Sequence, residues 1–227
     1  MKKVLLINYK AYKEAFTKGV DIANAAAEVS KETGVDVIVA PPFTMLKETK
    51  DLVKTIAQGV DEVDPGAFTA HITWFELKQS GVAGTLLNHS EKRYTYSKGG
   101  EIAYDKLQQA IEKCKAAGLE TYVCVENLEE ARKVAAMEPT AVAYEPPELI
   151  GGNISVTSAH PDIVKEFSDL IKKNSSSLPL IGAGVKRAED AKKSVELGAE
   201  GVLVASGIVL ANDFKAEIRN LASAMVN

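Results

Sequence analysis

Cysteine is scarce in this sequence. Its 227 residues include only two cysteines, Cys114 and Cys124, which form no CxxC pair and have no histidine close to them in the chain. Zinc sites are usually built from such clusters, so no metal site is expected. Cys124 stands inside the apolar run TYVCVE and is expected to be a buried small hydrophobic residue.

Long apolar runs and an excess of positive charge are also absent. The longest apolar runs, such as GVLVASGIVLA at 201–211, are too short to cross a bilayer, and the formal charge of −4 provides no basic surface for nucleic acid. The start MKKVLLINYK has an apolar run of only Val4–Ile7 and no small-residue cleavage site, so we expect a first strand and not a signal peptide. We therefore expect a cytoplasmic protein without a nucleic-acid or membrane partner.

What the sequence does contain is an eightfold alternation. Short, nearly continuous apolar runs, typical of parallel strands covered on both faces, are followed by stretches of helical periodicity such as 19–34 and 188–201. Glycines at 34, 81, 118 and 198 stand where these helices should end. No linker divides the chain, so the pattern predicts one α/β domain over residues 1–227, a (β/α)8 barrel with parallel strands at 3–8, 35–40, 55–59, 83–88, 120–125, 140–145, 178–183 and 201–206.

The functional site of such a barrel lies at the carboxyl ends of its strands. The residues at these tips are therefore the candidates for chemistry. They are Asn8, Tyr9 and Lys10, then residues 88–91, then Glu126 and Asn127, then Glu145, then the GAG segment at 182–184 and the ASG segment at 205–207.

Glu145 ends the sixth strand and begins the segment EPPELIGG. A carboxylate at the tip of a buried strand is partly desolvated, which makes it a useful base near neutral pH, although a lone strand-tip glutamate is more often a solvated charge. Two prolines stiffen one end of the following segment and two glycines free the other. Residues 146–152 are therefore either an ordinary loop or a lid with two hinges.

His89, one of three histidines, is by itself explained as well by a structural hydrogen bond as by catalysis. If Ser90 and Glu91 open a short helix, the positive end of the helix dipole disfavours the imidazolium and keeps a neutral donor that can polarise a carbonyl. His71 and His160 are expected at the surface.

The GAG and ASG segments follow the seventh and eighth strands, are short and consist of small residues. Backbone N–H groups in such segments can converge on an anion, and Lys10 after the first strand also suits an anionic substrate. These features indicate phosphate binding. GAG is not a dinucleotide fingerprint, because the position three past Gly184 is Arg187.

Taken in order, the tip residues 8–10, NHSEKR at 88–93, YEPPELIG at 144–151 and the GAG and ASG segments resemble the triosephosphate isomerase family in its shorter, archaeal-type form, over essentially the whole chain. The resemblance implies a TIM barrel that interconverts dihydroxyacetone phosphate and D-glyceraldehyde 3-phosphate through an enediol or enediolate, a step of glycolysis and gluconeogenesis, without a metal or cofactor. It implies Glu145 as general base, neutral His89 as electrophile, and a lid at 146–152 that grips the phosphate.

The resemblance also implies the substrate-binding residues. Lys10 matches an ammonium beside the substrate that Glu91 holds, and Asn8 matches its substrate-contacting neighbour. Ser90 matches a residue that holds the base when the lid is open. The implied phosphate contacts are Ile150, Gly184, Ala205 and Ser206.

A homo-oligomer, either dimer or tetramer, is implied as well, with loop 60–72 at the interface and Phe68 and Thr69 as contact candidates. The lid departs from bacterial and eukaryotic members, because the only tryptophan is Trp74, and the seventh tip has Ile181 where a tyrosine is usual. The hydrogen bonds of the closed lid are therefore expected to be rearranged.

Three other functions fit parts of the pattern. A ribulose-phosphate epimerase would be expected to carry metal-ligating histidines and aspartates at the tips, and these are missing. A Schiff-base aldolase needs a lysine at an inner strand position, where only Lys10 comes close. A barrel that only binds phosphorylated ligands would not need both Glu145 and His89.

Overall fold

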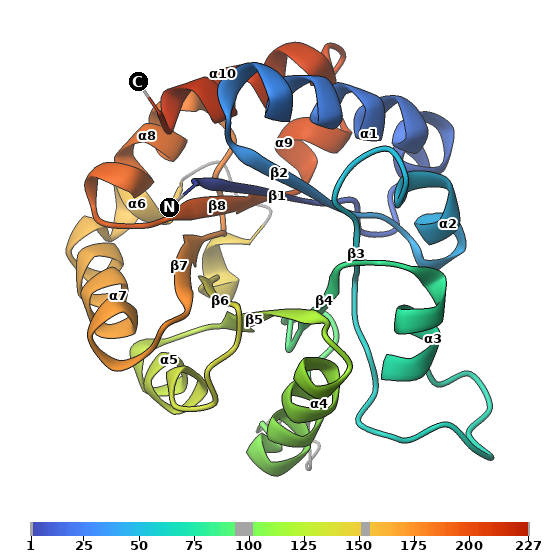
Figure 1. The fold of residues 1–227 in the computed structure, drawn as a ribbon. Helices are drawn as coiled ribbons and strands as arrows, with labels where there is room; N and C mark the ends of the chain where they lie inside the picture. Colours follow the sequence, from blue (N-terminus) through green and yellow to red (C-terminus); the bar gives the residue numbers. More distant parts are fainter. Residues whose placement is uncertain (1, 94–101, 151–154, 227) are drawn as a thin grey trace.

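The eight predicted strands form one parallel sheet that curves into a barrel, with the helices arranged around it (Figure 1). The computed structural model describes residues 2–93, 102–150 and 155–226. The strands are β1 (Val4–Asn8), β2 (Asp36–Ala40), β3 (Ile56–Ala57), β4 (Gly84–Leu87), β5 (Glu120–Val125), β6 (Ala141–Tyr144), β7 (Leu178–Ile181) and β8 (Gly201–Val204).

The sheet runs in the order β2-β1-β8-β7-β6-β5-β4-β3, so β2 and β3 are its two ends. A parallel bridge between Val39 and Thr55 joins these ends and nearly closes the barrel. Strand β3 is shorter than the predicted 55–59. At Gln58 the side-chain amide, rather than the backbone, donates to the Ala40 carbonyl (3.0 Å), and the strand ladder ends there.

Side chains along each strand alternate between two hydrophobic layers. In β1, Val4 and Leu6 point into the barrel, whereas Leu5 and Ile7 pack against the surrounding helices. Both faces are buried, which explains why the strands read as continuous apolar runs. The inner layer consists of Val4, Leu6, Ile38, Ala40, Ile56, Leu86, Tyr122, Cys124, Ala141, Ala143, Leu180 and Leu203.

The helices cover the barrel with amphipathic faces and end as the sequence predicts. Gly34, Gly81, Gly118 and Gly198 all adopt a positive φ, the left-handed conformation that closes a helix without a steric cost. The helices are α1 (Lys13–Thr33), η1 (Phe43–Met45), α2 (Leu46–Thr49), α3 (Trp74–Ser80), α4 (Tyr104–Ala116), α5 (Leu128–Ala135), η2 (Pro147–Leu149), α6 (Val156–Ala159), α7 (Pro161–Asn174), α8 (Ala188–Glu196), α9 (Ser206–Val209) and α10 (Phe214–Ala224).

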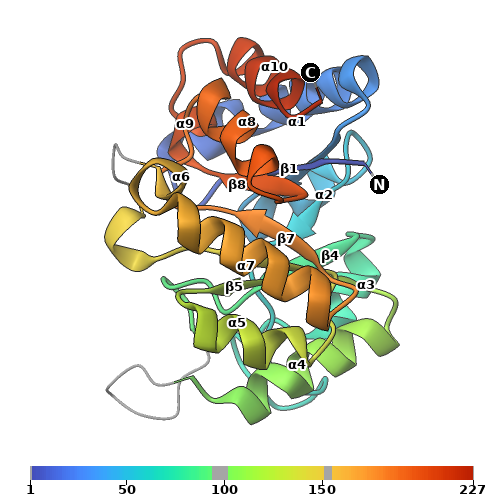
Figure 2. The same ribbon diagram turned by 90° about the vertical axis from the view of Figure 1, so that its left-hand side faces the viewer.

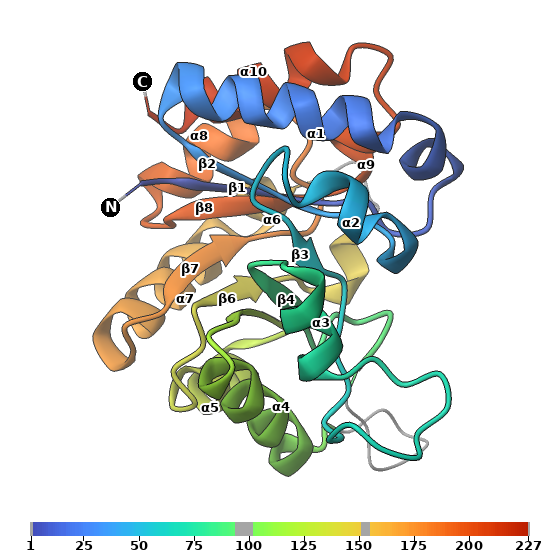
Figure 3. The ribbon, with the colours of Figure 1, turned by 45° about the vertical axis from the view of Figure 1, so that its right-hand side comes forward.

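Two loops that the sequence singled out lie at different places on the barrel. The described segment 145–150, which follows β6, lies on the face opposite the N-terminus, at the carboxyl ends of the strands (Figure 2). The long connection from β3 to α3, residues 60–72, stands out from the barrel beside α3 (Figure 3). Among the described residues, no helix has the length and apolar character that a membrane span requires.

Candidate active site

Strand β6 brings Glu145 to the strand tips. Its backbone N–H still donates to the Val125 carbonyl of β5 (2.8 Å), so the strand geometry extends to Glu145 before the prolines end it. Glu145 is only 5% exposed, and its side chain lies over the backbone of Gly182. A Cβ at position 182 would stand 2.5 Å from Glu145 Cγ and 2.6 Å from its Oε1, so only glycine fits beneath this carboxylate.

His89 follows β4 and is held by local hydrogen bonds. Asn88 adopts a positive φ of 56°, and its side-chain amide donates to the Cys124 carbonyl (3.0 Å), which fixes the turn against β5. The backbone N–H of Glu91 donates to His89 Nδ1 (3.2 Å). An Nδ1 that accepts carries no proton, so the ring hydrogen of a neutral His89 lies on Nε2.

The local structure that holds His89 differs from the one considered from the sequence. Ser90 and Glu91 form a turn, with the Lys92 N–H donating to the His89 carbonyl (2.8 Å), and not the start of a helix. The Glu91 N–H, and not a helix dipole, is the group that faces His89 Nδ1 here. Residues 94–101, where the predicted short helical region would continue, lie outside the described residues.

His89 and Glu145 face each other across the strand tips. His89 Nε2 and Glu145 Oε2 are 3.6 Å apart, too far for a hydrogen bond, and both atoms are buried without a partner. Buried polar atoms are normally paired, so two unpaired atoms aimed at one point indicate a place for a polar ligand. An N–H donor beside a carboxylate can stabilise charge on one ligand atom while the carboxylate takes a proton from its neighbour.

Cys124 is buried, as predicted, but it has an unpredicted neighbour. Its thiol lies inside the barrel close to the Glu145 carboxylate. Burial, followed by the negative charge of Glu145, raises the pKa of the Cys124 thiol well above its ordinary value. The thiol therefore stays protonated and presents a weak donor to the carboxylate.

Lys10 reaches the site from the tip of β1 in a strained conformation, with a positive φ of 48°. Asn8 Oδ1 accepts from the Lys10 N–H (2.9 Å), and Gln58 Nε2 donates to the Lys10 carbonyl (2.9 Å), so two side chains hold this backbone in place. The Lys10 ammonium lies 2.6 Å from Glu91 Oε1. Lys10 and the His89 turn are thereby connected through Glu91.

The residues expected to contact phosphate lie around one hollow next to Glu145. Among the backbone hydrogen bonds of the described residues, none uses the N–H groups of Gly184 or Ser206 as donors, so these amides are available to an anion. The Ile150 N–H instead donates to the Pro147 carbonyl (3.2 Å). The hollow is lined by Lys10, Tyr12, Glu145, Ile150, Ala183, Gly184, Val185, Lys186, Leu203, Val204, Ala205 and Ser206.

Arg93 supports the far side of the His89 turn. Its guanidinium pairs with Glu126 (2.5 Å) after β5 and with Glu130 (3.3 Å) in α5. Burial raises the pKa of Glu126, and the charge of Arg93 opposes that rise. The turn that carries His89 is thus tied to β5 and α5 at both ends.

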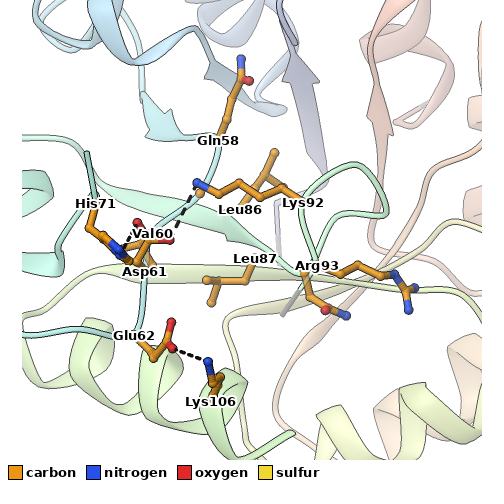
Figure 4. Close-up of a pocket in the computed structure, with 12 residues that line it drawn as sticks. Gln58, Val60, Asp61, Glu62, His71, Leu86, Leu87, Lys92, Arg93 and Lys106 are labelled. Carbon is orange, nitrogen blue, oxygen red and sulfur yellow. Dashed lines mark ion pairs between the residues drawn. The ribbon is translucent and has the colours of Figure 1, made fainter. Parts of the chain in front are cut away.

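A larger cavity, of about 230 Å³, lies behind this site between the base of loop 60–72 and the loop after β4 (Figure 4). It is lined by Asn88, Lys92 and Arg93, but neither His89 nor Glu145 reaches it. Three ion pairs cross its wall, joining Asp61 to His71 and Lys92 and joining Glu62 to Lys106. Because Glu145 lines the smaller hollow and faces His89, we place the candidate active site there.

The structure brings the predicted site residues together at one end of the barrel. One predicted contact is not formed: among the described residues Ser90 makes no hydrogen bond to Glu145, whose carboxylate is turned toward His89. His71 and His160 are both exposed, as predicted. Of the predicted lid, residues 151 and 152 lie outside the described residues.

The sequence reasoning missed the support for these residues. Gln58 holds Lys10, and Gly182 makes room for Glu145, although neither follows from spacing along the chain. The one sequence feature that could have indicated this support is Gly182 itself, a glycine at the tip of the seventh strand. No set of three or more His, Cys, Asp or Glu side chains that could hold a metal ion occurs within residues 2–93, 102–150 and 155–226.

Known proteins resemble this chain along nearly all of its length. A family model described as triosephosphate isomerase matches residues 3–221. A protein of that name from Methanocaldococcus jannaschii is 41% identical over 222 residues, covering 96% of this chain and 98% of the relative. Those from Methanopyrus kandleri and Caldivirga maquilingensis are 40% and 41% identical over 227 residues, covering 97% and 98% of this chain and 97% of each relative.

Proposed function

This chain belongs to the triosephosphate isomerase family, and from that premise we propose that it interconverts dihydroxyacetone phosphate and D-glyceraldehyde 3-phosphate. It is an aldose–ketose isomerase, and its reaction is a step of glycolysis and gluconeogenesis. The observation that carries the proposal is the His89–Glu145 pair, in which a donor and a base lie 3.6 Å apart, buried and unpartnered.

In the proposed reaction Glu145 takes a proton from the carbon next to the substrate carbonyl. The electron pair of the broken C–H bond forms the double bond of an enediolate, and the negative charge passes to the carbonyl oxygen. His89 stabilises that oxygen through Nε2–H, and the Lys10 ammonium adds positive charge nearby. His89 then gives its Nε2 proton to that oxygen and takes the proton of the neighbouring hydroxyl, so the second oxygen becomes the new carbonyl as Glu145 returns its proton to the carbon that carried the old one, which completes the isomerisation.

The phosphate of the substrate is proposed to lie in the hollow beside Glu145, against the N–H groups of Ile150, Gly184, Ala205 and Ser206, with Asn8 beside Lys10. For Ile150 to donate, its bond to the Pro147 carbonyl must break. This requirement agrees with a lid at 146–152 that rearranges when the anion binds. A closed lid excludes water and holds the enediolate in a geometry that resists loss of phosphate.

We further propose that residues 1–227 form one domain and that the enzyme is a homo-oligomer with loop 60–72 at its interface. Phe68, in this loop, is 49% exposed, and its ring packs edge-on against the His71 ring. An aromatic side chain presented this way favours contact with a second copy. The cytoplasmic location stays a prediction.

Replacing Glu145 with glutamine tests the assignment. Glutamine keeps the shape of the side chain but cannot accept a proton, so kcat for glyceraldehyde 3-phosphate should fall by about 10³-fold or more. The measurement is a coupled assay that follows dihydroxyacetone phosphate. Near-normal turnover by Glu145→Gln would refute the role.

A matched change elsewhere controls for general damage. Glu129 is an exposed glutamate in α5 that pairs only with Lys133, one turn along the same helix, at 2.8 Å. Glu129→Gln should retain wild-type turnover. If the wild-type protein itself does not isomerise either triose phosphate, the proposed function is wrong.

A further inference from the structure

Tyr12 lines the candidate active-site hollow and is neither the proposed base nor one of the proposed anion contacts. It stands two residues past Lys10 and is the N-cap residue of α1, without a side-chain capping bond. Its ring packs against the hydrophobic core and is partly buried. Its hydroxyl makes no hydrogen bond to any described residue.

Of the described tyrosines, Tyr12, Tyr104 and Tyr144 make no side-chain hydrogen bond, and of these three it is Tyr12 that lines the hollow. Tyr9, three positions earlier, is fully buried and donates to the Gly19 carbonyl (3.0 Å). Tyr122, inside the barrel, donates to Glu120 (2.6 Å). A tyrosine with a packed ring and a free hydroxyl beside a hollow is suited to meet a ligand, because the ring is already ordered before binding.

The position of Tyr12 indicates which part of the ligand it meets. Strand β1 pairs with β8, and α1 contacts α9, which begins at Ser206. Tyr12 lines the same hollow as Gly184, Ala205 and Ser206. His89, the group assigned to the carbonyl oxygen, does not line this hollow.

We propose that Tyr12 is a further substrate-binding residue, whose hydroxyl donates a hydrogen bond to the phosphate group of the substrate. The inference rests on the proposed function for the identity of the phosphate ester. Lys10 supplies charge and the amides supply directed donors, and Tyr12 adds a directed side-chain donor at the β1 side. Hydrogen bonds to charged acceptors are among the stronger ones in proteins.

The test replaces Tyr12 with phenylalanine, which removes one oxygen and keeps the ring. The KM for glyceraldehyde 3-phosphate and the inhibition constant of inorganic phosphate should each rise by about tenfold. Turnover of D-glyceraldehyde, which lacks the phosphate, should remain at the wild-type rate. A merely structural role would change all three quantities together, so unchanged glyceraldehyde turnover also shows that Tyr12→Phe is folded.

A second tyrosine-to-phenylalanine variant, made outside the hollow, shows whether the effect depends on where the hydroxyl is lost. Tyr104, in α4, lies outside the hollow with its ring under the Lys133 ammonium. Tyr104→Phe should leave KM and phosphate inhibition unchanged. If Tyr12→Phe binds phosphate and glyceraldehyde 3-phosphate as tightly as wild type, or loses glyceraldehyde turnover to the same extent, the inference is overturned.

The outcomes for Tyr12 and for the proposed function are distinguishable. An active wild-type enzyme with an unaffected Tyr12→Phe variant removes Tyr12 from the phosphate site and leaves the isomerase assignment intact. A wild-type protein that does not isomerise triose phosphates removes the assignment. In that case calorimetric titration with inorganic phosphate still tests Tyr12, because weaker binding by Tyr12→Phe supports the contact and equal binding contradicts it.

Discussion

At the scale of single residues, the orientation of Glu145 depends on an atom that is missing at position 182. The Glu145 side chain occupies the space directly above the Gly182 backbone, and a Cβ there would stand 2.5 Å from Glu145 Cγ. Heavy atoms this close repel strongly, so any larger residue would push the carboxylate away from His89 Nε2. Gly182 is therefore a positioning residue for the proposed base.

Alanine at position 182 tests this dependence. A displacement of the base by about 1 Å can cost about 10²-fold in turnover, and we expect a loss of this order in kcat for Gly182→Ala. Inhibition by inorganic phosphate should stay near the wild-type value, since the anion contacts are left in place. Gly59→Ala is the control, because a Cβ at position 59 would meet only Lys92 at an ordinary 3.7 Å. Equal kcat values for the two variants would contradict the steric argument.

The strand-tip residues could be predicted from the sequence, whereas their supports could not. Asn8, Lys10, His89 and Glu145 each end an apolar run, and parallel strands in a barrel place such ends together. The contact of Gln58 with Lys10 depends instead on how two loops, 48 residues apart, approach each other. Spacing along one chain carries no signal for such a contact.

At the scale of elements, ion pairs on the face opposite the active site join strands to helices. Glu200, just before β8, accepts from Lys3 before β1 (2.8 Å) and from Lys172 in α7 (2.6 Å). Burial alone would raise the pKa of Glu200, but the two ammonium groups outweigh it and lower the pKa below its ordinary value. The charged form is therefore favoured by the folded state.

Because its pKa is lowered, Glu200 stabilises the folded state when its carboxylate is charged and loses this effect when the pH falls. The contribution is present above about pH 4.5, the ordinary value for a glutamate, and is lost as the pH falls through the lower pKa of the folded state. Glu200→Gln should lower the free energy of unfolding by roughly 1 kcal/mol at pH 7 and by much less near pH 3. Urea unfolding at both pH values measures this, with a change at the exposed Glu196 of α8, Glu196→Gln, as control. A loss of equal size at both pH values would argue against the ion-pair account.

The elements themselves were mostly predictable, and the misses have local causes. All eight strands form within a few residues of their predicted bounds, because burial on both faces leaves an unbroken apolar run. Strand β3 is short because the Gln58 side chain replaces the backbone ladder. Ser90 and Glu91, considered as a possible helix start, form a turn in the described residues, where the Glu91 N–H donates to the His89 ring.

At the scale of the whole molecule, loop 60–72, the proposed interface, is held by contacts within the chain. Lys113 of α4 donates to the Glu62 carbonyl (2.7 Å) and pairs with Asp64 (3.0 Å), and Trp74 Nε1 also donates to Asp64 (3.1 Å). These contacts hold the base of the loop on α4 and α3, while Phe68 remains exposed. A preordered loop loses less conformational entropy when it binds.

Removing Lys113 should therefore weaken association of the subunits without touching the interface residues themselves. For Lys113→Met we expect the dissociation constant, measured by sedimentation velocity over a range of concentrations, to rise by about tenfold, equivalent to about 1.4 kcal/mol. High salt should weaken wild-type association in the same direction, because it screens the exposed Lys113–Asp64 pair. Lys115→Met is the matched control, since Lys115 lies on the same helix but bonds the Glu138 carbonyl (2.9 Å). If Lys113→Met associates as tightly as Lys115→Met, the order of this loop does not contribute to assembly. If the wild-type protein stays monomeric at every concentration, the proposed interface does not exist.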